Sequence, residues 1–242
     1  HVGRKVYRAK AVRCRSISSA LLDRELHRFT SSANYMLNCG FGTLFLVLAS
    51  GFLLWQGREL LELVSQSFPE RSGAMPVLLA FVLCLLSAMN DTTAPSVSLE
   101  GKSYWIVRSM PVGTKKILQA KLNLSNSLAV CPALVMMLAA SLALRLPAAQ
   151  TALLLGCQLM FVLLAANVGL MEDLRHCNLD WINETQAAKQ GAGVVLTMLI
   201  VWGFVLAIGA AYFLLLANVM DTPVFLALVL ALLAILYALS GR

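Results

Sequence analysis

Apolar stretches of a length that suits a lipid bilayer dominate this 242-residue sequence. A helix needs about 20 mostly apolar residues to cross the roughly 30 Å hydrocarbon core, because backbone groups cannot be left unpaired in lipid. Six stretches qualify, the second and sixth being short: residues 37–55, 74–90, 124–146, 148–171, 191–219 and 224–240. The sequence therefore predicts an all-α, polytopic membrane protein with six transmembrane helices. We expect the fifth to tilt or break.

Composition agrees with this interpretation and leaves no length for a separate soluble domain. Hydrophobic residues make up 59% and charged residues 13% of the chain, against about 45–50% and about 25% in an ordinary soluble domain. The basic residues that give the chain its net charge of +7 lie beside the apolar stretches. This position favours anionic lipid headgroups over nucleic acid as their partner. We divide the chain into a basic tail with an amphipathic helix, residues 1–36, and a six-span membrane domain, residues 37–242.

The Lys and Arg residues predict the orientation, because loops rich in these residues stay on the cytoplasmic side of a membrane. With six spans, 16 of the 19 basic residues fall on the face that holds the N-terminus, the second and fourth loops and the C-terminus. The other face holds Arg58, Arg71 and Arg145. Both termini are therefore predicted to be cytoplasmic.

The loop between the second and third stretches, residues 99–122, is unusually polar for this chain. We expect a short helix from a Ser98 cap to about Ser109, a break at Pro111 and a second helix, capped by Thr114, that runs into the third span. Three apolar residues of the first helix are expected to share one face: Leu99, Ile106 and Met110. A cytosolic partner could bind such a surface helix, although an interfacial membrane anchor is an equally good interpretation.

Two further polar segments lie on the same predicted face. In residues 16–29, Ile17, Leu21 and either Leu22 or Leu26 have helical spacing, which predicts an amphipathic helix on the membrane surface. The loop over residues 172–190 contains possible metal ligands that lack a recognisable spacing, and we interpret them as a solvated face: Glu172, Asp173, His176 and Cys177.

The sequence shows no pattern typical of catalysis, metal binding or nucleotide binding. The six cysteines form neither a C-x-x-C pair nor a cluster with histidine. The triplet Gly101-Lys102-Ser103 lacks the earlier glycine of a phosphate-binding loop, since that position holds Ser96. Ionisable residues are missing from the middle of all six stretches, which argues against a proton-coupled carrier and an intramembrane protease.

Three segments of the predicted cytoplasmic face contain recognisable residues in a consistent order. The first has Glu25, Tyr35, Asn38 and Gly42; the second has Glu100, Gly101, Trp105, Pro111 and Lys121; the third has Trp181, Asn183, Glu184, Lys189 and Gln190. In these residues the chain resembles the permease subunit of an ABC-2 type transporter, specifically the C-terminal membrane half of a longer bacterial exporter permease. The likeness covers nearly the whole chain.

The resemblance implies a plasma-membrane permease domain that works with a separate ABC ATPase and pairs with a second permease half or a second copy. It implies that ATP is bound by the partner and that this chain has no catalytic residue, metal or cofactor. The implied ATPase-coupling residues are Glu100, Gly101, Lys102, Trp105, Pro111 and Lys121 in the second loop, Trp181, Asn183, Glu184 and Lys189 in the fourth, and Leu21, Glu25 and Arg28 in the amphipathic helix. The alternative is a membrane scaffold or assembly factor that needs no ATPase.

Overall fold

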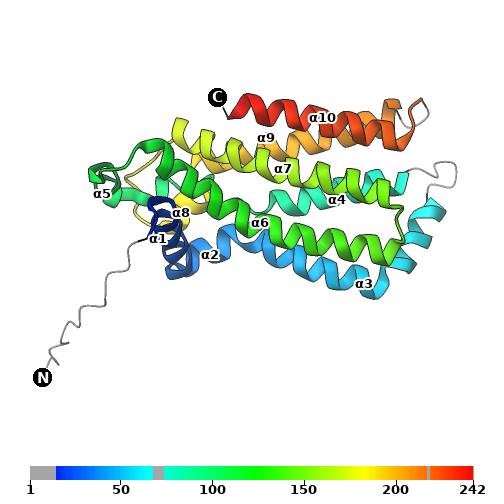
Figure 1. Ribbon diagram of the computed structural model, residues 1–242, viewed down its shortest axis with the longest axis horizontal. Helices are drawn as coiled ribbons and strands as arrows, with labels where there is room; N and C mark the ends of the chain where they lie inside the picture. The colour runs from blue at the N-terminus through cyan, green and yellow to red at the C-terminus, as the bar shows by residue number, and fades with distance from the viewer. Residues whose placement is uncertain (1–14, 68–73, 217–218, 242) are drawn as a thin grey trace, which may run out of the picture.

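The computed structural model describes residues 15–67, 74–216 and 219–241, and in these residues the chain is all-α, as predicted. Figure 1 shows the long helices lying alongside one another, with the short helices α1, α2, α5 and α8 at one end, which we call the polar end. In chain order the elements are α1 (Ile17–Ser31), α2 (Ala33–Cys39), α3 (Phe41–Ser67), α4 (Ala74–Ala88), η1 (Ser98–Ser103), α5 (Tyr104–Ser109), α6 (Thr114–Leu144), α7 (Ala148–Arg175), α8 (Glu184–Lys189), α9 (Ala192–Ala211), η2 (Tyr212–Leu216) and α10 (Thr222–Ser240). The first 14 residues of the expected basic tail and Arg71 lie outside the described residues.

Five helices are long and apolar enough to cross a membrane: Phe41–Leu60, Thr114–Leu144, Ala148–Arg175, Glu184–Leu216 and Thr222–Ser240. The second expected span differs, because α4 has 15 residues and is therefore about 22 Å long at 1.5 Å per residue. After α4 the chain leaves the helical conformation until η1, and residues 92–97 are all buried. Irregular backbone shielded from water needs protein around it, and the burial of residues 92–97 shows that they have it. Helix α4 itself packs against α3, α7 and α9.

Other helix boundaries partly match the sequence expectations. The first long helix begins at Phe41 rather than at residue 37, because α2 is a separate short helix that ends at Cys39 and is capped by Gly40. The third helix is one unbroken element from Thr114, as predicted for the segment that enters the third span. The expected irregularity in the fifth span is present, since α9 passes into the π-helix η2 at Tyr212.

The core of the bundle lies where α3, α4, α6, α7 and α10 meet. Each contributes at least one side chain to a single buried apolar cluster, including Leu46, Leu83, Met136, Leu154 and Leu226. Polar residues also join helices: Gln158 of α7 donates to Ser87 next to it in α4 at 3.4 Å. Because outward-facing Leu, Val and Phe side chains cover the outer surfaces of the long helices, those surfaces fit lipid.

The amphipathic helix α1 forms where the sequence predicts it, but a different face points inward. Leu21, Glu25 and Phe29 are buried, whereas Ile17 and Leu26 remain exposed. Helix α1 packs across α6 and against α2. Its inner face therefore contains a carboxylate, which apolar spacing alone does not reveal.

The loop over residues 99–122 contains the expected helix, break and helix, with a kink added in the first piece. Gly101 has φ 51° and ψ −135°, a combination that side-chain-bearing residues rarely adopt. Because the kink at Gly101 lies inside η1, between Leu99 and Ile106, Leu99 is buried and Ile106 is exposed, so they do not share a face as predicted. The break occurs at Pro111, and Gly113 rather than Thr114 precedes the first turn of α6.

Candidate functional site

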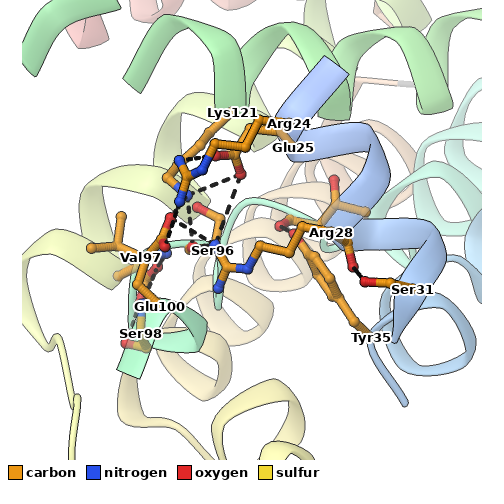
Figure 2. A network of polar contacts seen from close by, with 12 residues as sticks. Arg24, Glu25, Arg28, Ser31, Tyr35, Ser96, Val97, Ser98, Glu100 and Lys121 are labelled. Carbon is orange, nitrogen blue, oxygen red and sulfur yellow. Dashed lines mark hydrogen bonds and ion pairs between the residues drawn. The ribbon is translucent and has the colours of Figure 1, made fainter. Parts of the chain in front are cut away.

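A buried group of charged side chains joins α1, η1 and α6 at the polar end (Figure 2). At its centre, Lys121 Nζ lies 2.7 Å from Glu100 Oε1 and 3.1 Å from Glu25 Oε2. The ammonium group also donates to the carbonyl oxygen of Ser96 at 2.9 Å. The side chains of Lys121 and Glu100 are each 2% exposed. A lysine this deeply buried is stable only with such partners, because desolvating an unpaired charge is costly.

Two arginines of α1 complete this group, which we call the charge cluster. Arg24 Nη2 lies 2.9 Å from Glu100 Oε2, and Arg24 Nη1 lies 3.0 Å from Glu25 Oε1. Arg28 Nη1 lies 2.7 Å from Glu100 Oε1. The cluster therefore contains three cations and two carboxylates, and Glu100 of η1 contacts all three cations.

The charges around Glu100 decide its protonation. Burial alone raises the pKa of this carboxyl, but the charges of Lys121, Arg28 and Arg24 and the hydrogen bond from Lys121 outweigh burial and lower the pKa below its usual value. Glu100 is therefore ionised at neutral pH. The charge cluster is an ion-pair network that fixes η1 between α1 and α6.

A second set of contacts holds η1 from the opposite side. Asp173, near the end of α7, accepts hydrogen bonds from the backbone N–H groups of Val97 and Ser98 and from the Ser98 hydroxyl. Trp181 Nε1 donates to the carbonyl oxygen of Ser98 at 2.7 Å. The Trp181 ring also lies against Gly101, where an added Cβ would come within 2.9 Å of it. The kink of η1 is thus packed as well as hydrogen-bonded.

The third contact region joins α2 and α8. Ser32, the cap of α2, donates to Glu184 Oε2 at 2.6 Å, and Asn183 caps α8 by accepting from the Thr185 N–H. Tyr35 donates its hydroxyl to the carbonyl oxygen of Thr92 at 2.7 Å, in the irregular segment that follows α4. The segments before α3, after α4 and before α9 are thereby tied together.

The residues assigned from the sequence fall into two groups in the structure. One group lies in or directly against these contacts: Leu21, Glu25, Arg28, Glu100, Gly101, Lys121, Trp181 and Glu184. The other has exposed side chains: Lys102, Trp105, Pro111, Asn183 and Lys189. Of the exposed group, Trp105 is the largest, with 68% of its surface accessible. It lies on α5 beside the exposed Ile106 and Arg108.

Several residues of the site were not predicted from the sequence, and two were predicted wrongly. Arg24, Ser96 and Ser98 were not assigned, and the expected solvated face is wrong for Glu172 and Asp173, which are buried. Glu172 lies 2.7 Å from Arg175 Nη1. One feature of the sequence did indicate that Asp173 faces inward. It lies four residues after Gly169, so the acidic residue and this small residue share one face of α7. In the described part of the chain, no group of three or more His, Cys, Asp or Glu residues could hold a metal ion.

Comparison with known proteins adds one finding. A family model described as "Putative ATP-binding cassette" matches residues 77–239, which extend from α4 to α10 and include η1, α5 and the loop that carries Trp181. No curated protein and no solved structure matches the chain. The match includes Glu100 and Lys121 of the charge cluster and leaves α1 outside.

Proposed function

The chain belongs to this ATP-binding cassette family, and from that premise we propose that it is the membrane-spanning permease subunit of an ATP-driven ABC-2 type exporter. In this proposal a separate ATPase binds and hydrolyses ATP at the polar end, and this chain supplies the path across the membrane. A second permease half or a second copy completes the transporter. The five long apolar helices make the chain a multi-pass membrane protein.

The observation that carries the proposal is the attachment of η1 and α5. The charge cluster, Asp173 and Trp181 fix η1 from several sides, while the next six residues, α5, expose Trp105 and Ile106. Tryptophan and arginine are the residue types enriched at the centre of protein interfaces. Segment 98–109 therefore has a firmly held inner side and an outer side free to contact an ATPase.

A displacement of α5 would reach the membrane through α6. This helix begins at Thr114, directly after the Pro111 break, and continues to Leu144, a length of about 46 Å at 1.5 Å per residue. Lys121 attaches its second turn to η1. ATP binding in the partner would shift the populations of two permease states only if the partner binds those states with different affinities.

We propose the orientation in which the polar end is cytoplasmic. The described basic residues Lys115, Lys116 and Lys189 belong to elements at that end, whereas Arg145 follows the far end of α6. In this arrangement α4, with the buried segment after it, completes the second of six passes, and both termini are cytoplasmic. Cysteines introduced at Lys115 and Arg58 should then react with an impermeant reagent from opposite sides of the membrane. Labelling from the same side would overturn the topology.

The functional test is association with an ATPase. The tagged full chain, extracted from its native membrane in mild detergent, is expected to retain an ABC ATPase whose activity is measured in the eluate. Trp105→Ala should reduce the retained ATPase activity severalfold, whereas Trp55→Ala should not, although Trp55 is 81% exposed, because it lies about four turns along α3 from the polar end. If no ATPase is retained, the scaffold alternative is favoured. Unchanged activity after deletion of Leu99–Ser109 would refute the coupling role.

A further inference from the structure

A cleft of about 510 Å³ opens beside the polar end, outside the charge cluster. Its walls come from three places where apolar helices begin or end: Phe41 and Phe45 at the start of α3, Met89 just after α4, and Met198 and Trp202 in the first turns of α9. The volume falls within the range of pockets that hold a small molecule. Because the three helix ends meet here, the cleft lies at the depth where hydrocarbon gives way to headgroups.

Two opposite charges line the polar part of this cleft, Asp91 and Lys189. Both lie close enough to the Cys39 thiol to act on it: burial raises the pKa of that thiol, Asp91 raises it further and Lys189 lowers it. Burial also raises the pKa of the Asp91 carboxyl to about 7, against a hydrogen bond from the Ala94 backbone. The cleft thus has a partly buried carboxyl group whose pKa lies near neutral and an exposed ammonium group.

The apolar part of the cleft also has an unmet polar group. The Trp202 indole N–H is buried and has no hydrogen-bond partner among the described residues, although buried tryptophans usually find one. Phe41, Phe45 and Met198 are each roughly 40–50% exposed, so the apolar wall is open toward the surface that faces lipid. The cleft therefore offers an apolar wall, one hydrogen-bond donor and a pair of opposite charges.

We propose that this cleft binds one phospholipid with an amine-bearing headgroup, such as phosphatidylethanolamine, from the leaflet next to the polar end. Its ammonium group pairs with Asp91, its phosphate accepts from Lys189, and an ester carbonyl of an acyl chain that lies along Phe45 accepts from the Trp202 N–H. An anionic lipid without an amine would meet Lys189 but would supply no cation for Asp91. This inference goes beyond the proposed function, because it requires neither an ATPase nor a transported cargo.

Tryptophan quenching by labelled lipids tests the site. The full chain is placed in phosphatidylcholine nanodiscs that contain phosphatidylethanolamine or phosphatidylglycerol with a bromine-labelled acyl chain. The signal of Trp202 is the difference between the wild type and Trp202→Phe. We expect half-maximal quenching of this signal at about fivefold less labelled phosphatidylethanolamine than phosphatidylglycerol. The difference signal of Trp55, obtained with Trp55→Phe, is the control and should show no preference.

Two variants separate the site from ordinary contact with surrounding lipid. Asp91→Asn should bring the two labelled lipids within about twofold of each other. Lys189→Gln alters an exposed side chain, so it is expected to fold normally and to weaken quenching by both lipids, while the exposed Lys116→Gln should change neither. Equal quenching of Trp202 by both lipids, no quenching, a preference for phosphatidylglycerol, or an unchanged preference in both Asp91→Asn and Lys189→Gln would overturn the proposal. None of these results would affect the ATPase test.

Discussion

Replacing Lys121 with methionine removes the central cation of the charge cluster and leaves a side chain of similar length. The Lys121 ammonium contacts three acceptors, Glu100, Glu25 and the Ser96 carbonyl, within 3.1 Å. Removing one partner of a buried ion pair costs roughly 3–5 kcal/mol. We expect about 3 kcal/mol, the lower end of that range, because Arg24 and Arg28 remain to balance the two carboxylates.

Equilibrium unfolding of the full chain in detergent micelles, titrated with sodium dodecyl sulfate and followed by fluorescence, measures this cost. Lys116→Met is the matched control, since it changes an exposed lysine of the same helix and should stay within about 0.5 kcal/mol of the wild type. Because Glu100 and Lys121 are in contact, the double variant Glu100→Gln/Lys121→Met should cost less than the sum of the single variants by about 1–3 kcal/mol. A Lys121→Met cost below about 1 kcal/mol, or strict additivity, would refute the role of the cluster.

The same substitution has a consequence for pH dependence. The folded-state pKa of Glu100 is lowered, so its ion pairs contribute stability that is fully present above the ordinary carboxyl pKa of about 4.3 and is lost as the pH falls through the folded-state value. Lys121→Met removes the charge that lowers this pKa most. The folded-state pKa therefore rises toward or above its ordinary value, so the loss of stability on acidification should be smaller in Lys121→Met than in the wild type. Identical acid profiles would contradict the assignment.

Three further variants test the attachment of η1. Gly101→Ala should destabilise the chain by about 2–3 kcal/mol in the same unfolding assay, because of its backbone conformation and the Trp181 ring 2.9 Å from the new Cβ. Gly113→Ala, with open space around it, is the control and should cost less than about 1 kcal/mol, the loss expected when alanine replaces glycine at a helix N-cap. Asp173→Asn should cost about 1–3 kcal/mol and speed hydrogen exchange of the Val97 and Ser98 amides, whereas the exposed Asp180→Asn should do neither. The last pair of variants joins helices by a cross-link, with the native cysteines replaced by serine. A cross-link between cysteines at Leu21 of α1 and Ile117 of α6 should abolish the ATPase activity measured with the partner, while one between Val107 of α5 and Ile117 should not. Equal effects of the two cross-links would refute a motion of α1 relative to η1 and α6.

The sequence was sufficient to predict the features that depend on local chemistry. Apolar length predicts the long helices, and Pro111 predicts the break before α6. The resemblance assigned Glu25, Glu100 and Lys121 to an ATPase-binding face, but it did not predict that Glu25 and Lys121, 96 positions apart, contact each other. The short α4 was not predictable in this way, because residues 89–97 lose their helical form through tertiary contacts. The Tyr35 hydroxyl, for example, binds the Thr92 carbonyl there.

Buried charges were predicted least well, for a definite physical reason. The helix-end position of Asp173 and the lack of a metal-ligand spacing around it predicted a solvated side chain. Only 1% of its surface is exposed, because three donors from residues 97 and 98 replace the water it loses. Those donors are 75 or 76 positions away in the chain. The helical spacing of residues in α7 can place Asp173 on the inner face of that helix. It cannot reveal the distant hydrogen-bond donors that compensate for the desolvation of the carboxylate.

Charge balance indicates which contact of the cluster can separate. Helix α1 supplies Arg24, Glu25 and Arg28, which pair with one another within the helix at 3.0 and 3.9 Å. Glu100 and Lys121 form a neutral pair at 2.7 Å without any contribution from α1. Moving α1 away therefore leaves charged partners together on both sides, whereas separating η1 from α6 would strand a buried ammonium and a buried carboxylate. A conformational change at this site should accordingly move α1 relative to η1 and α6 together, which is why tying Leu21 to Ile117 is expected to be inhibitory and tying Val107 to Ile117 is not.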